Sequence, residues 1–370
     1  MALFLVSFIG TSVAAAPNLL DASIEDIQTM LSNEDISSVD LVEWYTARIE
    51  RYDQNGPNLN AIQYSNPHAL AQALALDKER KVSGPRSLLH GIPLVIKDNY
   101  ETIDAPTTAG SAILADHWPK RDAAQVARLK QAGAIVLAKT NMHEFAYGWT
   151  TRGSAFGVTR NPYNPNRHPG GSSGGTGAAV SANLATAGMG SDTCGSIRVP
   201  AAHNNLVGLR GTQGLSSRSG IIPLSSSRDV GGPLARSVRD LAILLDNTVG
   251  YDPFDSQTGE SLGKIPASYL DGLKKLDLNH LRIGVLTDWF GPDKAVGSAN
   301  NAVRSLLEKL HKAGAQVVKL SSPELKLLQI ETTSPSAGFV DDYDLKRDLP
   351  AYMAQFPPLP TLSFAALTND

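Results

Sequence analysis

The stretch between residues 148 and 227 constrains the fold of this chain more than any other feature of its sequence. Its composition shifts sharply toward Gly, Ser, Asn and Pro, and residues 177–187 are its one longer segment with a periodic apolar pattern. A stretch of this length is too long for a structureless loop within a compact domain. We therefore expect functional loops arranged around one short helix and short strands.

The segments before and after this stretch alternate between strand and helix patterns. Residues 88–96 form an apolar run that ends in the polar triplet Lys97-Asp98-Asn99, as expected for a buried strand with polar groups at its C-terminal end. A helical pattern over 122–132 and a second apolar strand over 134–138 follow. The same order returns later in the segments 281–286, 302–313 and 315–320. Strand, helix, strand predicts an α/β fold with parallel strands.

The N-terminal part of the chain has two distinct patterns. Residues 18–80 read as covering helices, with Ser23 as an N-cap three residues before Asp26 and a helix over 38–52. Residues 1–16 are apolar and then rich in Ala, as in a signal peptide, but lack its basic start. Two interpretations stay open: a secreted protein with a cleaved leader, or a cytoplasmic protein with an N-terminal arm. The apolar run is shorter than the ~20 residues of a membrane span.

Composition excludes several classes of function. Lys and Arg number 33 against 36 Asp and Glu, giving a net charge of -3, so the chain lacks the basic surface of a nucleic-acid-binding protein. A single cysteine, Cys194, excludes internal disulfides and cysteine-based zinc sites. The eight histidines show no metal-binding spacing and are interpreted as surface or structural residues. We predict no metal and no cofactor.

The chemistry is expected in two serine clusters inside the Gly-rich stretch. Residues 170–177 (GGSSGGTG) run into an Ala-rich helix, so backbone amides at a helix N-terminus are available to an anion or oxyanion. No Gly-Lys-Ser/Thr or G-x-G-x-x-G is present, which argues against phosphate and dinucleotide loops. A G-x-S-x-G pattern occurs at 171–175, but the apolar strand that a nucleophile elbow needs does not precede it.

The second cluster, residues 191–200 (SDTCGSIRVP), supplies a possible partner for the first. Ser196 follows Ser172 by 196 - 172 = 24 residues, enough for a loop, a short helix and a return across a cleft. A serine nucleophile needs a base. Lys97 ends a strongly apolar strand, where desolvation lowers the pKa of a lysine and makes its neutral amine available.

These motifs resemble the amidase signature family. The resemblance runs from about residue 20 to about residue 349 and is closest to general bacterial and fungal amidases related to the glutaminase subunit of transamidosomes. The segments that carry it are 89–99 (LHGIPLVIKDN), 107–114 (TTAGSAIL), 138–148 (AKTNMHEFAYG), 170–180 (GGSSGGTGAAV) and 190–212 (GSDTCGSIRVPAAHNNLVGLRGT). It implies one amidase domain over 17–370, with a large mixed β-sheet covered by helices.

The resemblance also implies a role for each matching residue. Ser196 would be the acyl-forming nucleophile, Ser172 the relay serine on a cis peptide bond, and Lys97 the base of a Ser-cisSer-Lys triad. The other implied positions are the oxyanion-binding amides of Thr193, Cys194, Gly195 and Ser196, the supporting hydroxyl of Ser173, and an ion pair of Asp192 with Arg198. Ser173 could equally be a turn serine. Cys194 stands where many members carry Gly, and we interpret it as a small buried residue.

The implied activity is hydrolysis of a carboxylic amide through a seryl acyl-enzyme acting on a small-molecule amide. Two alternatives remain: a glutaminase or transamidase subunit that needs a partner, and a weakly active or non-catalytic interaction protein. The second arises because the chain ends where family members normally continue with further helix and sheet, so its C-terminal part is expected to be shortened. Aromatic residues Phe145, Tyr147 and Trp149 could line an acyl pocket or belong to the core.

Overall fold

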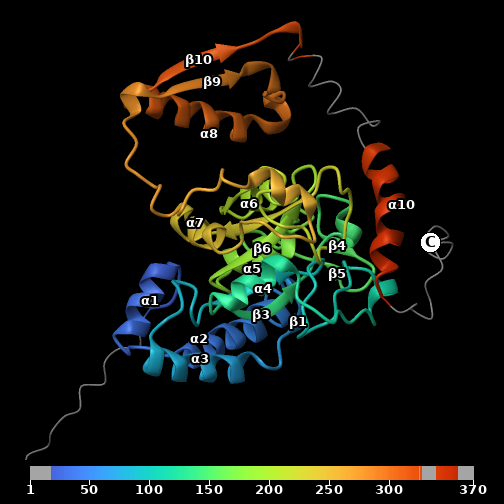
Figure 1. Ribbon diagram of the computed structural model, residues 1–370. Coiled ribbons are helices and arrows are strands. Elements are labelled where there is room, and N and C mark those ends of the chain that lie inside the picture. The colour runs from blue at the N-terminus through green and yellow to red at the C-terminus, as the bar shows by residue number, and fades with distance from the viewer. Residues whose placement is uncertain (1–17, 325, 327–338, 357–370) are drawn as a thin grey trace, which may run out of the picture. The chain divides into compact units, whose positions relative to one another are not determined.

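The computed structural model describes residues 18–324, 326 and 339–356, which fall into two compact units (Figure 1). Unit 1 holds residues 18–223 and Arg228–Ala267, and unit 2 holds Leu224–Ser227 and Ser268–Phe356. The possible signal peptide at 1–16 lies outside the described residues. A single amidase domain over 17–370 stays a prediction.

Unit 1 is built on a six-stranded sheet with the order β1-β3-β2-β6-β8-β7. The strands are β1 (Ile62–Ser65), β2 (Pro93–Lys97), β3 (Ile135–Thr140), β6 (Ala187–Asp192), β7 (Val207–Gly208) and β8 (Val230–Ala235). Strands β3, β2 and β6 run parallel to one another, whereas β1, β8 and β7 pair antiparallel with their neighbours. The predicted large mixed sheet with a parallel centre is therefore confirmed. Every residue of the three parallel strands is buried.

Helices cover this sheet. They are α1 (Ile24–Ser32), α2 (Ser38–Arg48), α3 (Ala69–Ser83), α4 (Ala124–Gln131), α5 (Gly174–Ser181), α6 (Arg198–His203) and α7 (Val238–Asp246). Helices α1 to α3, coloured blue in Figure 1, lie together at one side of unit 1, and α5 contacts the four strands β3, β2, β6 and β8. Shorter elements are the π-helical turn Ile49–Gln54, the hairpin strands β4 (Arg152–Gly153) and β5 (Gly157–Val158), and 3₁₀ turns at Ala112–Leu114, Glu144–Ala146 and Ser256–Ser261.

Local sequence signals account for some boundaries and not for others. Ser23 and Asp26 form the predicted capping box, in which each side chain bonds the other residue's backbone N–H. The short helix expected after the GGSSGGTG segment is α5, which begins inside that segment at Gly174 and ends at Ser181; β6 starts at Ala187. Apart from Ser181, every residue of α5 and β6 is buried, so burial does not distinguish the helix from the strand here.

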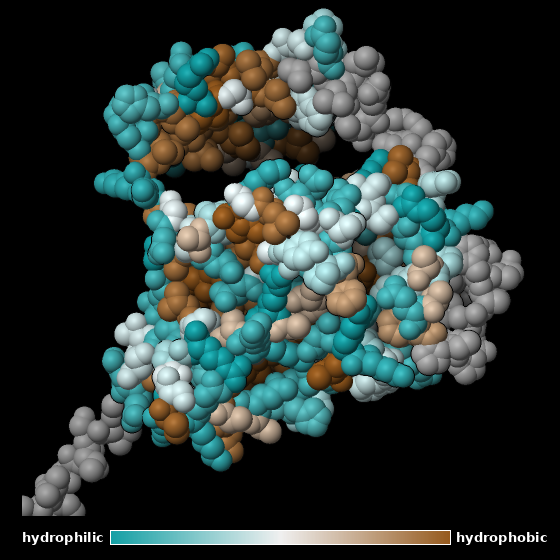
Figure 2. All heavy atoms as spheres, in the orientation of Figure 1, coloured by the Kyte–Doolittle hydropathy of each residue, from teal (hydrophilic) through white to brown (hydrophobic). Residues whose placement is uncertain are grey.

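Unit 2 contains the second strand, helix, strand segment. Strands β9 (Arg282–Leu286) and β10 (Gln316–Leu320) are parallel, as predicted, and the helix between them, α8 (Asp293–Lys312), starts earlier than the expected residue 302. Short 3₁₀ turns occur at Leu278–His280 and Thr287–Trp289. Figure 2 shows a broad hydrophobic area, coloured brown, on this unit. Exposed apolar side chains of unit 2 include Leu286, Val303, Leu306 and Leu320.

The C-terminal part of unit 2 is helix α10 (Phe339–Met353). It is joined to the segment Leu224–Ser227 by Asp344, whose carboxylate accepts hydrogen bonds from Ser225 at 2.6 Å and Ser227 at 2.5 Å. The helix includes Pro350 and ends at Met353. Residues 357–370 lie outside the described part. Among the helices that the structure describes, none has the length and apolarity needed to cross a bilayer.

Candidate active site

The candidate site lies where the central parallel strands of unit 1 end. Lys97 is the last residue of β2, and Asp192 is the last residue of the neighbouring strand β6. Parallel strands present their carboxyl ends at one edge of a sheet, so these polar groups meet there. Helix α5 closes on the same edge: a Cβ at Gly175 would stand 2.1 Å from the carbonyl oxygen of Asn141, so only glycine permits this approach.

Lys97 is fully buried and forms the centre of a hydrogen-bonded cluster. Its Nζ lies 2.7 Å from Ser172 Oγ and 2.8 Å from Ser191 Oγ, and Asn99 Nδ2 donates to the same Ser191 oxygen at 2.9 Å. Burial lowers the pKa of Lys97 to about 7, and the negative charges of Asp229 and Asp192 act in the opposite direction. A neutral amine in contact with the Ser172 hydroxyl is therefore available near neutral pH. The cause of this shift, burial at the end of an apolar strand, is the one that the sequence suggested.

The two serine clusters meet at this lysine. Ser172 is buried and follows a cis peptide bond from Gly171, as the resemblance implied. The next residue, Ser173, donates its backbone N–H to the carbonyl oxygen of Ser196 at 3.2 Å and its hydroxyl to the carbonyl oxygen of Ser191 at 3.1 Å. Ser196 is also buried. Ser173 thus fastens the relay-serine segment to the segment of the predicted nucleophile.

Asp192 organises the loop that carries Ser196. Its carboxylate accepts the backbone N–H of Gly195 at 2.7 Å and of Ile197 at 3.1 Å. The predicted ion pair with Arg198 is present, with an N–O separation of 3.1 Å, and Arg210 adds a second cation at the same distance. Burial opposes ionisation, but the hydrogen bonds from Arg198 and from the two N–H groups hold the pKa of Asp192 below its usual value.

Two implied features of this loop differ from expectation. The Gly195 N–H, one of the amides assigned to an oxyanion hole, donates to Asp192. Cys194 is exposed, so its interpretation as a buried residue is wrong. Thr193, Gly195 and Ser196 are buried in this loop, whereas the side chain of Cys194 points to solvent. Thr193 itself is held by its hydroxyl, which donates to Asp229 at 2.5 Å.

His143 is a neighbour of this site that the sequence analysis missed. It is half-buried, and its backbone N–H donates to the carbonyl oxygen of Ser172 at 3.1 Å. The Thr150 N–H donates to its Nδ1 at 3.4 Å. Burial lowers the pKa of His143; Glu144 acts in the opposite direction, and the charge of Lys97 lowers it further. The available signal was its position three residues after the end of β3.

Two of the three aromatic residues that follow His143 are exposed to solvent. Tyr147 and Trp149 are 46% and 54% exposed, so the interpretation of these two residues as part of the core is wrong. Phe145 is half-buried. An acyl pocket lined by these rings stays a prediction.

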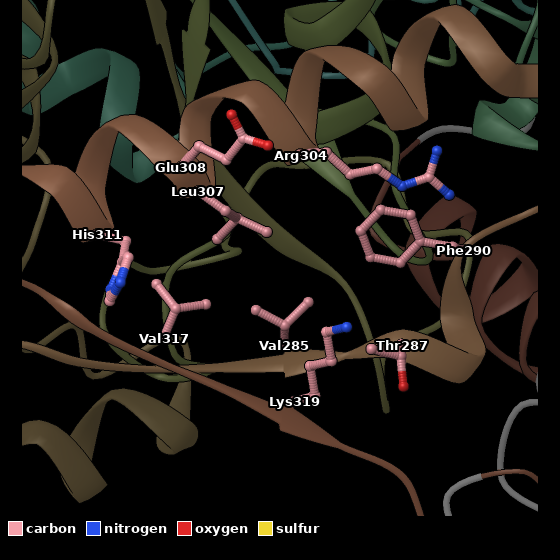
Figure 3. Close-up of a pocket in the computed structure, with 9 residues that line it drawn as sticks. All are labelled: Val285, Thr287, Phe290, Arg304, Leu307, Glu308, His311, Val317 and Lys319. Atoms are coloured by element: carbon pink, nitrogen blue, oxygen red, sulfur yellow. The ribbon is translucent and has the colours of Figure 1, made fainter.

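A separate cavity of about 540 Å³ lies within unit 2, between α8 and the strands β9 and β10 (Figure 3). Val285, Leu307 and Val317 project into it together with the imidazole of His311 (Figure 3). His311 Nδ1 lies 3.2 Å from the carbonyl oxygen of Ala315. Among the described residues that line this cavity there is no serine, so they do not provide the pairing of hydroxyl and base that Lys97 and Ser172 provide in unit 1.

Comparison with known proteins agrees with these motifs. The family model described as Amidase matches residues 40–350. The glutamyl-tRNA(Gln) amidotransferase A subunit of a Marinomonas species is 40% identical over 310 residues, covering 84% of this chain and 62% of that protein. The corresponding protein of Roseiflexus castenholzii is 42% identical over 310 residues, covering 82% and 61%. The chain therefore spans about 62% of the length of the curated relatives it matches.

Solved structures give the same result. The native peptide amidase of Stenotrophomonas maltophilia superposes with a TM-score of 0.85 and 38% identity, covering 94% of this chain and 70% of that one. An amidase family protein from Bacillus anthracis has a TM-score of 0.82 and 33% identity, covering 94% and 68%. The fold, the motifs and these similarities agree, and the chain belongs to the amidase signature family.

Proposed function

We propose that this chain hydrolyses carboxylic amide C–N bonds through a seryl acyl-enzyme. The observation that carries the proposal is a fully buried Lys97 whose Nζ lies 2.7 Å from Ser172 Oγ. Membership of the amidase family supports the reaction class. Ser196 is the nucleophile, Ser172 the relay and Lys97 the base.

In the first half-reaction, neutral Lys97 accepts the proton of Ser172 while Ser172 accepts that of Ser196. Ser196 Oγ then attacks the carbonyl carbon and forms a tetrahedral oxyanion. The proton returns through Ser172 to the nitrogen of the leaving group, the C–N bond breaks, and amine or ammonia departs. Water repeats the sequence on the ester and regenerates the serine.

The oxyanion would be held by backbone N–H groups of the Ser196 loop. Because Gly195 N–H donates to Asp192, we assign this role to the N–H groups of Thr193, Cys194 and Ser196. Asp192 and Arg198 keep the loop in place. Ser173 supports the arrangement through its bonds to Ser191 and Ser196.

The direct test is a panel of simple amides with ammonia or amine release as the readout. We expect turnover of at least one primary or aryl amide, and an unchanged rate after treatment with a chelator, since no step uses a metal. Cooperative thermal unfolding is the control for a folded preparation. A folded protein that turns over no amide would contradict the proposal and favour a non-catalytic interaction protein.

The activity is expected to depend on pH through Lys97. Below a pKa of about 7 the amine is protonated and cannot accept the proton of Ser172. We predict that kcat/KM rises about tenfold per pH unit below this value and levels off above it. The profile should be measured from pH 5.5 to 9 with a neutral amide. A flat profile, or an apparent pKa near that of a solvated lysine, would contradict the role of Lys97.

A second candidate is an ammonia-supplying component of an amidotransferase, because the curated relatives carry that name. This function requires glutamine as the amide and a partner that accepts the ammonia. It would use the same three residues. Glutamine hydrolysis that appears only when a partner protein is added would favour it over independent amide hydrolysis.

A further inference from the structure

The segment after His143 forms a wall beside the proposed nucleophile. Its backbone lies very close to Gly171. A Cβ on Gly171 would stand 2.7 to 2.9 Å from the carbonyl carbon of Trp149 and the backbone nitrogens of Thr150 and Thr151. The indole nitrogen of Trp149 lies 3.8 Å from the point where a Cβ on Gly195 would stand. Trp149 therefore neighbours both the cis peptide bond of the relay serine and the residue that precedes Ser196.

The two residues that follow Trp149 anchor this wall through hydrogen bonds. Thr151 Oγ1 donates to the carbonyl oxygen of Gly170 at 2.8 Å and accepts the N–H of Gly174 at 3.0 Å. The Thr150 N–H donates to His143 Nδ1, and the backbone N–H of His143 in turn donates to the carbonyl oxygen of Ser172. The backbone of the wall is thus bound to the segment that holds Ser172.

The indole ring, in contrast, is open to solvent. Trp149 is 54% exposed although its neighbours Gly171 and Gly195 are buried. In the part of the chain that the structure describes, no hydrogen-bond acceptor is assigned to its indole N–H. A large flat ring held on a fixed backbone next to a reactive group offers a stacking surface at little conformational cost.

We propose that Trp149 determines substrate specificity by stacking on an aromatic group adjacent to the scissile amide. The proposal rests on the proposed function, because it assumes that the amide binds at Ser196. The aromatic group can belong to the acyl part or to the amine part of the substrate. An aromatic ring on the acyl or the amine part of the substrate would displace water from the face of the indole ring. A small aliphatic amide would not reach the indole ring.

The test measures binding without catalysis. In a Ser196→Ala background, affinities would be measured by calorimetry for phenylacetamide against propionamide, and for acetanilide against N-methylacetamide. We expect Trp149→Ala to weaken binding of one or both aromatic amides by roughly 10- to 100-fold and of the aliphatic amides by less than about threefold. Trp149→Phe, which keeps a ring, should stay within about threefold of the parent. If only phenylacetamide loses affinity, the acyl part of the substrate stacks on Trp149; if only acetanilide does, the amine part stacks.

Trp118, 58% exposed in the same unit, supplies the matched control as Trp118→Ala. Equal losses for aromatic and aliphatic amides, unchanged aromatic affinity in Trp149→Ala, or no aromatic preference in the parent would each overturn the proposal. Turnover by the protein with Ser196 intact is scored separately. Aromatic preference without turnover would remove the proposed function and leave the stacking site in place.

Discussion

Replacing Ser196 with alanine is expected to lower kcat for any amide substrate by about 10⁴- to 10⁶-fold, because no acyl-enzyme can form. Lys97→Met should cost a similar factor, since Ser172 then has no base within reach. The double variant should be no worse than either single variant, because the three residues act as one unit. Ammonia release under saturating substrate measures all three.

The control is Ser181→Ala, which removes another serine hydroxyl at the end of α5 and should leave kcat within about twofold. Thermal unfolding should show that Ser196→Ala and Lys97→Met remain folded. Additive losses in the double variant would mean that Lys97 and Ser196 act in separate steps.

The second large effect concerns the stability of the loop around Asp192. Asp192→Ala leaves the N–H groups of Gly195 and Ile197 and the cations of Arg198 and Arg210 without their shared acceptor. Removing one partner of a buried ion pair typically destabilises a protein by about 3–5 kcal/mol. We expect a loss of about 3 kcal/mol in the free energy of unfolding, because water can solvate the exposed Arg198 side chain.

The measurement is the urea midpoint of unfolding together with kcat on one amide. Arg239→Ala is the matched control: it breaks the solvent-exposed pair with Glu25 and should leave the urea midpoint nearly unchanged. Asp192→Ala should also lower kcat, because the N–H groups assigned to the oxyanion lose their fixed positions. A variant with wild-type stability and activity would mean that Asp192 does not hold this loop.

The sequence predicted the centre of the fold and its polar edge well, for local reasons. The strands β2 and β3 are short apolar segments that end in polar residues: Lys97 closes β2, and Lys139 and Thr140 close β3. Burial of that strand end is what lowers the pKa of Lys97. The order of strands and helices was then enough to predict a parallel centre for the sheet.

Other features depend on contacts that no local pattern records. Arg210 reaches Asp192 from 18 residues away, and His143 reaches Ser172 through a backbone bond. The outward side chain of Cys194 and the bond from Gly195 to Asp192 depend on how one loop turns. The change from α5 to β6 takes place between two buried elements, and burial alone does not mark it. These features are set by tertiary structure, so the sequence pattern alone could not predict them.

The proposal depends most directly on the identity of the residue that becomes acylated. A fluorophosphonate probe that reacts with activated serines, followed by peptide mass spectrometry, reads this out without knowledge of the natural substrate. The mechanism predicts one adduct, on Ser196, that forms faster as the pH rises through about 7 and is absent from Ser196→Ala. An adduct on another residue, or labelling that persists in Ser196→Ala, would contradict it.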